Sequence, residues 1–416
     1  MGFKIKRIIV VGAGPAGMMA AIRAAECKSE VILIDKNPAP GKKLLLSGKG
    51  RCNLTNACDL DSFLKRFSGN GQFLRDAFNK FFNRELMDFF VSRGLELKTE
   101  RQLRVFPVTD SSASIAGALE KELAKQNVKL MFKRRVKDIR VKDKEVKGLS
   151  LDDGEFIPAD RIILATGGVS YGFTGSTGEG LDMAKSSGHG IVSLRPGLVP
   201  LVVREKYPKS LEGLTLKNIS IKFCSPKNEI VSEVGELLFT GFGISGPLVL
   251  TLSGKIVDWL NDKKEVSVEI DLKPGLSRQQ LDARLLREFK TDAKKGVKNV
   301  MKNLLPLRLI GLFLELARID PHKKANQVTA SERLALINLL KGWRLGISGP
   351  LSLEEGMVTK GGVSLKDINP RTMGSRRVLG LYFCGEMIDV DADTGGFNLQ
   401  AAFSTGYLAG ESAALG

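Results

Sequence analysis

The chain has 416 residues, 43% of them hydrophobic and 26% charged, which is ordinary for a soluble globular protein. This length predicts two or three domains with large cores. The first apolar run begins almost at the N-terminus and is short, which argues against a signal segment and a membrane span. The five cysteines are odd in number and lack C-x-x-C spacing, and the two histidines lie far apart. We therefore expect no metal site and a reduced, cytoplasmic setting.

The net charge of +17, with a pI near 9.6, is unusual for a metabolic enzyme. Such charge favours RNA, anionic lipid or an acidic substrate as a partner. Basic residues cluster at positions 129–147 and 287–302, but acidic residues are interleaved in the first cluster and aromatic residues make up only 6% of the chain. We therefore interpret the charge mainly as solvated, lysine-rich surface, and nucleic-acid binding stays open as the alternative.

The N-terminal segment RIIVVGAGPAGMMAAI predicts a dinucleotide-binding turn. Residues 8–11 form a short β-branched run, typical of a strand buried in a parallel sheet. Gly12, Gly14 and Gly17 fill the G-x-G-x-x-G pattern. The first permits a tight turn, the second lets the backbone approach a pyrophosphate, and the third allows a helix to pack closely on the strand.

The segments that follow complete this nucleotide site. Pro15 and Ala16 open a helix whose N-terminus directs partial positive charge toward the phosphates. Asp35 ends the second strand, where a carboxylate accepts hydrogen bonds from ribose hydroxyls. A second glycine-rich segment, GLYFCGEMIDVDADTGGFNLQAAFSTGYLAG, occupies positions 380–410. We interpret the two segments as halves of one site for a large dinucleotide, for which FAD is the natural candidate.

Between these segments the sequence pattern changes several times. We expect an amphipathic helix at 73–92 with an aromatic stripe of the core type, a second helix at 114–126, and strands within 128–166. Alternating runs at 191–272 predict a β-rich part, and leucines at helical spacing predict helices at 277–343. The predicted fold class is α/β, with a discontinuous Rossmann-like FAD domain of the two-dinucleotide-binding type. The predicted domains are 1–190 with 344–416 for FAD, 191–275 for an inserted β-domain, and 276–343 for an inserted helical domain.

Long motifs over essentially the whole chain resemble those of one family. They are GAGPAG, SGKGRCNLTN (47–56), RVFPVTDSSA (104–113), ATGGVSYGFTGSTGEG (165–180), VTKGGVSLKDINPRTM (358–373) and GLYFCGEMIDVDADTGGFNLQ (380–400). In this combination the chain resembles the bacterial three-domain flavoproteins related to aminoacetone oxidase, usually labelled NAD(P)/FAD-dependent oxidoreductases. One relative in that family is proposed to act in bile-acid metabolism. The motifs are specific for the family and say little about the substrate.

The resemblance implies a set of contacts to FAD. Lys43 would neutralise phosphate charge, Val136 would offer a backbone amide to the adenine edge, and Gly385 with Glu386 would lie near the ribityl chain. Further residues of the implied cofactor site are Lys36, Ser47, Gly48, Ala165, Thr166, Gly167, Asp389, Gly395, Gly396, Asn398 and Leu399. Glu386 and Asp389 resemble an acid–base pair, but we favour a role in orienting the cofactor-binding turn.

The motif SGKGRCNLTN carries the candidate catalytic residues. We expect Arg51 and Asn53 to hydrogen-bond flavin carbonyls or to hold the loop, and Arg51 to stabilise negative charge on reduced flavin. Cys52 beside this cation would have a lowered pKa, but a packed cysteine is the favoured interpretation. The chain departs from the family pattern at Gly172, where proline is common, and at Gly374, where an acidic residue is usual. Both departures concern local loop shape.

The sequence thus predicts an FAD-dependent oxidoreductase that transfers a hydride between flavin and a small organic substrate bound between domains. Amines and unsaturated carbonyl compounds are the candidate substrate classes. Only one G-x-G-x-x-G follows a strand, so NAD(P)H would serve as a transient electron donor without a domain of its own. Two alternatives stay open, a flavin-dependent RNA-modifying enzyme and a non-catalytic flavin-binding regulator. The sequence leaves the oligomeric state undecided.

Overall fold

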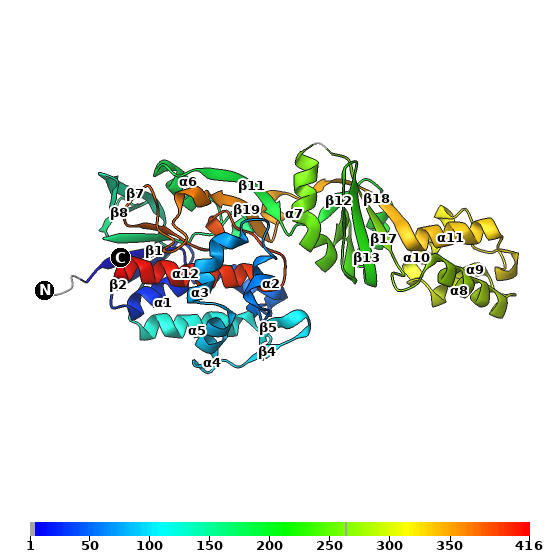
Figure 1. Cartoon of the computed structure of the whole chain (residues 1–416), viewed down its shortest axis with the longest axis horizontal. Coiled ribbons are helices and arrows are strands. Elements are labelled where there is room, and N and C mark those ends of the chain that lie inside the picture. The colour runs from blue at the N-terminus through cyan, green and yellow to red at the C-terminus, as the bar shows by residue number, and fades with distance from the viewer. Residues whose placement is uncertain (1–4, 263) are drawn as a thin grey trace. The chain divides into compact units, whose positions relative to one another are not determined.

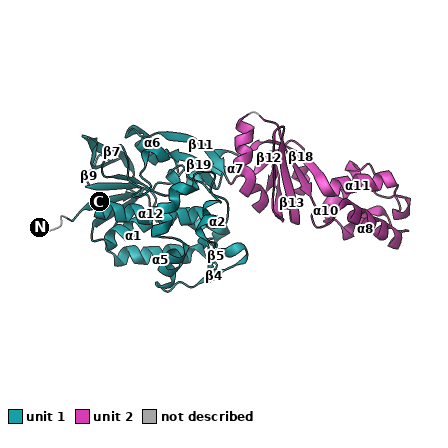
Figure 2. Ribbon diagram, viewed as in Figure 1, with its two compact units in different colours: residues 1–197, 352–416 teal, residues 198–351 magenta. Residues whose placement is uncertain are grey.

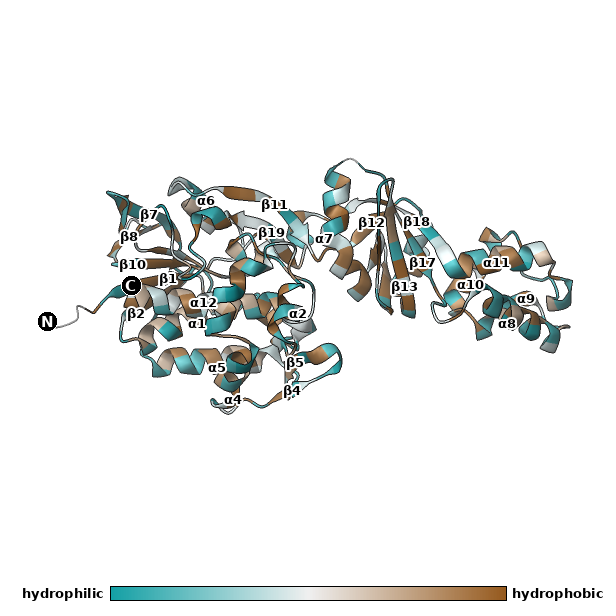
Figure 3. Cartoon of the chain, viewed as in Figure 1, coloured by the Kyte–Doolittle hydropathy of each residue, from teal (hydrophilic) through white to brown (hydrophobic). Residues whose placement is uncertain are grey.

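The computed structural model describes residues 5–262 and 264–416, and the chain divides into two compact units (Figure 2). Unit 1 comprises Met1–Gly197 and Ser352–Gly416, and unit 2 comprises Leu198–Leu351. In both units the apolar residues concentrate on the strands and on the helix faces packed against them (Figure 3). Within unit 2, strand and helix residues share one hydrophobic core. The division of this unit into a β-domain and a helical domain stays a prediction.

A five-stranded parallel sheet forms the centre of unit 1 (Figure 1). β1 (Arg7–Val11) lies between β2 (Glu30–Asp35) and β10 (Arg161–Leu164). β6 (Lys129–Phe132) adds to β2, and β20 (Leu381–Phe383) adds to β10. The central β1 is buried on both faces, as its β-branched sequence predicts for a parallel strand. The two ends of the chain therefore share one sheet, and the predicted Rossmann-like domain is confirmed.

Two helices from opposite ends of the chain pack side by side in unit 1. They are α1 (Pro15–Glu26) and α12 (Phe397–Leu415) (Figure 1). A Cβ at Gly406 would lie 2.2 Å from the Ala16 carbonyl oxygen, and a Cβ at Gly410 would lie 2.3 Å from the Ala20 carbonyl oxygen. Because only glycine leaves room for so close an approach, these two positions allow the helices to touch along their backbones. The order of the contacts shows that the helices run in the same direction.

Among the described residues of unit 1, three small antiparallel sheets and five further helices surround this centre. The sheets are β3 (Thr55–Asn56) with β5 (Arg104–Pro107) and β4 (Leu97–Thr99), then β7 (Val136–Lys142) with β8 (Glu145–Leu151) and β9 (Phe156–Pro158), and β11 (Ile191–Gly197) with β19 (Val358–Val363). The helices are α2 (Leu60–Leu64), α3 (Arg75–Lys80), α4 (Asn83–Val91), α5 (Ser112–Lys125) and α6 (Glu179–Ser186). The predicted helix at 114–126 is confirmed as α5.

The prediction of a single helix at 73–92 is wrong, because the helix is interrupted between α3 and α4. Phe81 adopts an extended conformation, with φ −154° and ψ 94°. The buried Asn83 side chain donates to the carbonyl oxygens of Asn56 and Cys58, at 2.8 and 2.9 Å, and the Glu85 carboxylate accepts from the Phe82 N–H. These contacts begin a new helix at Asn83. The phenylalanine stripe nevertheless lies in the core, as predicted.

Unit 2 is built on antiparallel strands that close on themselves. They are β12 (Leu201–Val203), β13 (Thr215–Ser225), β14 (Asn228–Val231), β15 (Gly235–Thr240), β16 (Gly243–Ser245), β17 (Val266–Asp271) and β18 (Trp343–Pro350). Pairing of β13 with β17 completes a ring of strands, with β14 attached to β13. Such closure leaves fewer exposed strand edges. The predicted FAD domain included positions 344–350, but β18 pairs with β12 and β17, and Trp343 is buried against Phe239 and Phe313.

The helices of unit 2 are α7 (Pro247–Asn261), α8 (Arg278–Thr291), α9 (Val297–Val300), α10 (Leu307–Leu316) and α11 (Ala330–Gly342). α8 to α11 pack together beside one end of the strands (Figure 1). In the part of the chain that the structure describes, no helix combines the length and apolar character needed to cross a membrane.

His189 lies just after the C-terminal end of α6 and contacts its last turn. Its Nδ1 contacts the Ala184 carbonyl oxygen at 3.0 Å, its Nε2 contacts Ser375 Oγ at 2.7 Å, and its ring packs edge-on against Phe383. Burial lowers the pKa of His189 below its usual 6.5, with Asp367 and Arg377 as nearby charges of opposite effect. The folded protein therefore binds fewer protons at this site than the unfolded chain does.

We expect the stability contributed by neutral His189 to be present above pH 6.5 and to be lost as the pH falls below that value. Thermal unfolding of the wild type between about pH 8 and about pH 5.5 should therefore show a steeper fall in Tm than unfolding of His189→Gln. Equal slopes for the two proteins would contradict this assignment.

Candidate functional site

The glycine turn after β1 is packed by protein on one side and open on the other. Gly12 has a φ of +102°, and a Cβ there would lie 2.6 Å from the Ala165 carbonyl oxygen. A Cβ at Gly17 would lie 1.8 Å from the Gly12 carbonyl oxygen. At Gly14, in contrast, no protein atom comes within 4 Å of the Cβ position. Gly12 and Gly17 thus serve the fold, whereas Gly14 faces space that a pyrophosphate can occupy.

The N-termini of α1 and α12 face the same way at this site. Each helix directs free N–H groups and partial positive charge from its first turn, and neither first turn contains an acidic residue. α12 contacts Ala16, near the start of α1, through Gly406, which is nine residues after the first residue of α12, Phe397. At 1.5 Å per residue, α12 therefore extends about 14 Å beyond the start of α1. This offset suits an extended dinucleotide, with the pyrophosphate at α1 and the rest of the molecule reaching toward the start of α12.

Asp35 holds the glycine turn from the end of β2. Its carboxylate accepts from the Ala13 N–H at 2.7 Å and from the Asn37 N–H at 2.7 Å. These charge-assisted bonds fix the turn that carries Gly14, in addition to any bond to ribose, which stays a prediction.

We expect Asp35→Ala to weaken FAD binding more than it lowers stability, because it releases the turn from its two backbone partners. The loss should be about 1.5–3 kcal/mol in binding free energy, roughly tenfold to a hundredfold in Kd. Cofactor titration alongside circular dichroism measures both effects. Asp35→Asn retains one acceptor oxygen, so its Kd for FAD should lie between those of the wild type and Asp35→Ala. A Kd unchanged in both variants would remove Asp35 from the site.

Lys43 and Glu386, predicted separately, meet in an ion pair. Lys43 Nζ lies 2.6 Å from Glu386 Oε2, and both side chains are largely buried. The other carboxylate oxygen, Glu386 Oε1, accepts from the Thr359 N–H at 2.8 Å. Glu386 Oε2 also lies 3.9 Å from the Cβ position of Gly167, in the turn after β10. The pair therefore joins three motifs around the glycine turn and reduces the charge that Lys43 can offer to a phosphate.

The SGKGRCNLTN motif contacts the glycine pair before α12. With its amide oriented so that both polar atoms are paired, Asn53 donates to the Thr55 carbonyl oxygen and accepts from the Gly396 N–H, each at 3.1 Å. The Asn56 amide donates to the Gly395 carbonyl oxygen at 3.3 Å. A Cβ at Gly396, whose φ is +97°, would lie 2.4 Å from the Thr55 carbonyl group. These contacts bring the two ends of the chain together, as the two glycine-rich segments predict.

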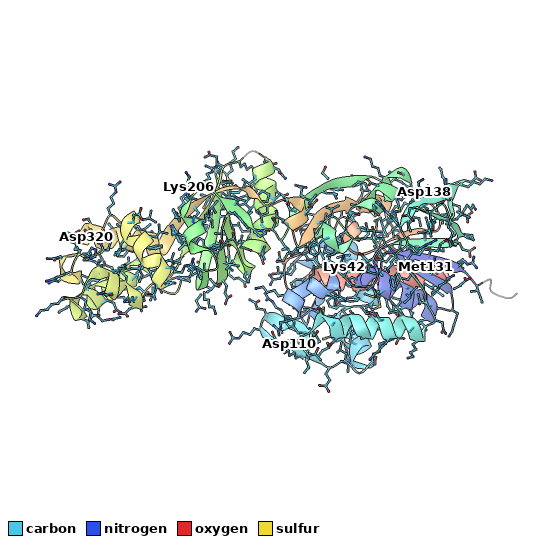
Figure 4. All side chains as sticks on the ribbon, turned by 180° about the vertical axis from the view of Figure 1, so that it is seen from behind. Lys42, Asp110, Met131, Asp138, Lys206 and Asp320 are labelled. Atoms are coloured by element: carbon cyan, nitrogen blue, oxygen red, sulfur yellow. The ribbon has the colours of Figure 1, made fainter. Side chains whose placement is uncertain are left out.

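Arg51 lies at the outer side of the same motif, over the Phe106 ring of β5. Its guanidinium donates to Asp110 and Glu100, with Nη2 2.6 Å from Asp110 Oδ1 and 2.5 Å from Glu100 Oε1. These hydrogen bonds raise the pKa of Arg51. Figure 4 labels Asp110 on the loop that follows β5. The catalytic role of Arg51 stays a prediction, and the structure adds that its charge is shared with two carboxylates.

Cys52 is fully buried, and burial raises the pKa of its thiol to about 11. The thiolate is therefore scarce near neutral pH, and the packed-cysteine interpretation is confirmed. Cys52 and Cys58 are both free thiols. Among the described residues, no group of three His, Cys, Asp or Glu side chains is arranged to hold a metal ion.

The predicted adenosine end of the site lies at β7. Val136 is the first residue of this strand, and it borders an open groove of about 1200 Å³ formed with α6 and positions 376–378. Glu179 at the start of α6 pairs with Lys36 at 2.8 Å and with Arg135 at 2.9 Å. Lys36 therefore ties the end of β2 to α6, and its charge is compensated by Glu179. The adenine contact of Val136 stays a prediction.

The other predicted cofactor residues line or support the same turns. Ser47 donates to the Leu44 carbonyl oxygen, and Gly48, with φ +57°, packs on the backbone of Asn53. Ala165 and Thr166 follow β10, against Gly12 and against Gly180 of α6. The Asn398 amide closes the turn at Ala392, and Leu399 packs on the core. Asp389 accepts from Asn70, and burial raises the pKa of its carboxyl group.

Several supporting residues were missed by the sequence reasoning. Thr359 Oγ1 accepts from the backbone N–H groups of Val169 and Ser170, and it would lie 2.2 Å from a Cβ at Gly168. Thr405 Oγ1 accepts from the Gly385 N–H at 2.9 Å. Thr359 lies inside one of the family motifs, but nothing in its local sequence indicates that it contacts Val169 and Ser170 after β10.

Comparison with known proteins agrees with this geometry. Residues 6–412 match the family model described as the HI0933-like protein Rossmann domain. The chain is 33% identical over 418 residues to 3-dehydro-bile acid delta(4,6)-reductase from Clostridium scindens, covering 99% of both chains. It is 31% identical over 401 residues to ribosomal RNA dihydrouridine synthase from Escherichia coli, covering 96% of both.

Among solved structures, a 3-ketosteroid-delta4-(5alpha)-dehydrogenase from Rhodococcus jostii shares the fold. The TM-score is 0.54 at 16% identity, with 100% of this chain and 98% of that chain covered. The family resemblance drawn from the motifs is confirmed by the matches along the whole chain. The chain belongs to the HI0933-like Rossmann family, and it is an FAD-dependent oxidoreductase.

Proposed function

We propose that this flavoprotein reduces a carbon–carbon double bond that is conjugated to a carbonyl group. The observation that supports the proposal is the pair of full-length relatives. One is named as a reductase of a 3-dehydro-bile acid with 4,6 unsaturation, and the other as a dihydrouridine synthase. A 3-keto-4,6-diene and the uracil ring both present a double bond in conjugation with a carbonyl, and in both it becomes a single bond. Addition of a hydride to one carbon of that bond and of a proton to the other is the chemistry that the two names share.

The residues present fit FAD, which when bound would supply the hydride. The open space at Gly14 and the N-terminus of α1 would receive the pyrophosphate, and the Gly395–Gly396 turn at the start of α12 would approach the flavin ring. The protein's part is to orient the cofactor and to place backbone N–H groups beside it. NAD(P)H as a transient electron donor and a cytoplasmic setting stay proposals.

We propose further that Arg51 assists reduction of the flavin and that Asn53 positions the adjoining turn. Arg51→Ala should slow flavin reduction while FAD stays bound, measured by anaerobic stopped-flow absorbance. Lys98→Ala is a matched control, because Lys98 pairs with the same two carboxylates, Asp110 at 2.6 Å and Glu100 at 3.6 Å. If flavin reduction slows equally in the two variants, Arg51 only holds the loop and does not assist the reaction.

The substrate class has two candidates. A small enone is the first, in line with the bile-acid reductase. A uracil base within RNA is the second, and the net charge of +17 favours it, because RNA binding draws on positive surface charge. An amine substrate and a non-catalytic regulator are less favoured, because both relatives are named for reactions on unsaturated rings.

The test is anaerobic reoxidation of the reduced holoprotein. Chemically reduced enzyme is mixed with α,β-unsaturated ketones, with uridine-containing RNA and with the corresponding saturated ketones, and the visible absorbance of the flavin is followed. We expect the unsaturated compounds to restore the oxidised spectrum, with the saturated product detected by mass spectrometry. A flavin that stays reduced with every unsaturated compound, as with the saturated ketones, would overturn the proposal.

A further inference from the structure

The helical part of unit 2 carries a large share of the positive charge of the chain. Residues 277–342 contain 14 Lys and Arg against 6 Asp and Glu, an excess of eight within a net charge of +17 for all 416 residues. This segment spans α8 to α11. Nearly half of the net charge is therefore carried by less than a fifth of the chain.

Folding brings two lysine-rich segments of this part together. The Val297 N–H donates to the Lys323 carbonyl oxygen at 2.8 Å, and the Ala325 N–H donates to the Lys295 carbonyl oxygen at 2.9 Å. The sequences AKKGVK (293–298) and HKK (322–324) thus lie side by side, although more than twenty residues separate them. Asp320, labelled in Figure 4, precedes the second segment and accepts from the His322 N–H.

Four lysines in or shortly after these two segments are uncompensated within the described chain. Lys295 pairs with Asp292, and Lys323 pairs with Glu332. The four other lysines are exposed and form no ion pair within residues 5–262 and 264–416: Lys294, Lys298, Lys302 and Lys324. We call these four residues the lysine cluster. Lys298 and Lys302 are four positions apart along α9 and the 3-10 turn that follows it, so they project on one side.

The residues between these lysines indicate what the surface binds. The apolar residues Val297, Val300 and Met301 are buried, while the neighbouring Asn299 and Asn326 are exposed. A membrane-binding basic surface would expose apolar side chains between its lysines for insertion, whereas amides beside lysines suit phosphate and sugar groups. The exposed leucines of this part, such as Leu307 and Leu334, lie on α10 and α11, outside the segments 293–302 and 322–324 that carry these lysines. We infer that the lysine cluster binds the phosphate backbone of RNA. The inference rests on the proposed function, since it makes the RNA the carrier of the base to be reduced.

The test compares two FAD-loaded variants of equal net charge. The first reverses the cluster (K294E, K298E, K302E and K324E). The second reverses four exposed lysines elsewhere that form no ion pair within the described chain: K65E, K121E, K217E and K227E. Binding of a fluorescent single-stranded oligouridine is measured across a salt series, with phosphatidylglycerol vesicles as a second probe. Circular dichroism and the flavin spectrum establish that both variants fold and retain FAD.

We expect the cluster variant to bind oligouridine at least about tenfold more weakly than the control variant. The slope of log K against log salt should fall by about 3, because each lost phosphate contact removes about 0.7. Equal losses in the two variants would show a general charge effect and overturn the inference. So would cluster-dependent binding to vesicles rather than RNA. Enone reduction should be unchanged in the cluster variant. If the wild type itself fails to reduce enones, that result contradicts the proposed function, whereas the RNA-binding comparison tests the lysine cluster.

Discussion

Gly14→Val should yield a folded protein without FAD. No protein atom lies within 4 Å of the Cβ position, and Gly14 has φ −78° and ψ −179°, an extended conformation that valine adopts readily. The valine methyl groups would instead occupy the space in front of α1 where a pyrophosphate must approach the backbone. We expect the purified variant to be colourless and to show the wild-type circular dichroism spectrum. Cofactor content after reconstitution with excess FAD is the measurement.

Two further glycine variants make this result specific. Gly349→Val changes a residue of β18 whose Cβ position is equally open, and this variant should retain FAD. Gly17→Val places a side chain 1.8 Å from the Gly12 carbonyl oxygen, so it should misfold rather than lose only the cofactor. A Gly14→Val protein that stays fully flavinated would show that the pyrophosphate does not lie at this turn.

Gly396→Ala should strongly destabilise unit 1 and release FAD. The residue combines a left-handed φ of +97° with a Cβ position 2.4 Å from the Thr55 carbonyl group. The left-handed conformation alone costs alanine about 1–2 kcal/mol. Relief of the overlap must push the start of α12 away from the SGKGRCNLTN motif, which breaks the Asn53 contact to the Gly396 N–H. We expect a total loss of at least about 3 kcal/mol in the free energy of unfolding.

Gly69→Ala is the matched control for this prediction. Gly69 has a φ of +99°, but no protein atom lies within 4 Å of its Cβ position. Denaturant unfolding of the two variants therefore separates conformational strain, present in both, from the overlap with Thr55, present in one. If both variants lose the same stability, the close approach of the two chain ends contributes nothing beyond glycine's backbone preference.

The elements that could be predicted are those whose pattern is local. The strand, glycine turn, helix and acidic residue between Arg7 and Asp35 lie where their spacing indicates, because each step depends on neighbours within a few residues. The single helix predicted at 73–92 was wrong for the opposite reason. Its break is held by Asn83, whose side chain bonds to backbone at positions 56 and 58, and no helical periodicity reports such a partner.

The same limit applies to charged side chains. Composition predicts a basic surface, but compensation by neighbours depends on the three-dimensional packing. Lys43 meets Glu386 from a distance of more than three hundred residues, and Lys36 meets Glu179. The lysines at 294, 298, 302 and 324, in contrast, form no ion pair within the described chain. Charge is additive along a sequence, whereas the screening of each charge is decided by what folding places beside it.

The amino-acid sequence alone was sufficient for the cofactor class, because the turn before α1 and the spacing of its glycines are short-range requirements of a bound pyrophosphate. The identity of the partners around that turn came only from tertiary structure. Asp35 holds the Ala13 N–H, Asn53 holds the Gly396 N–H, and Gly406 lets α12 approach Ala16. The last two contacts join segments that lie more than three hundred residues apart along the chain, so no local pattern could indicate them; they depend on the close packing of the folded protein.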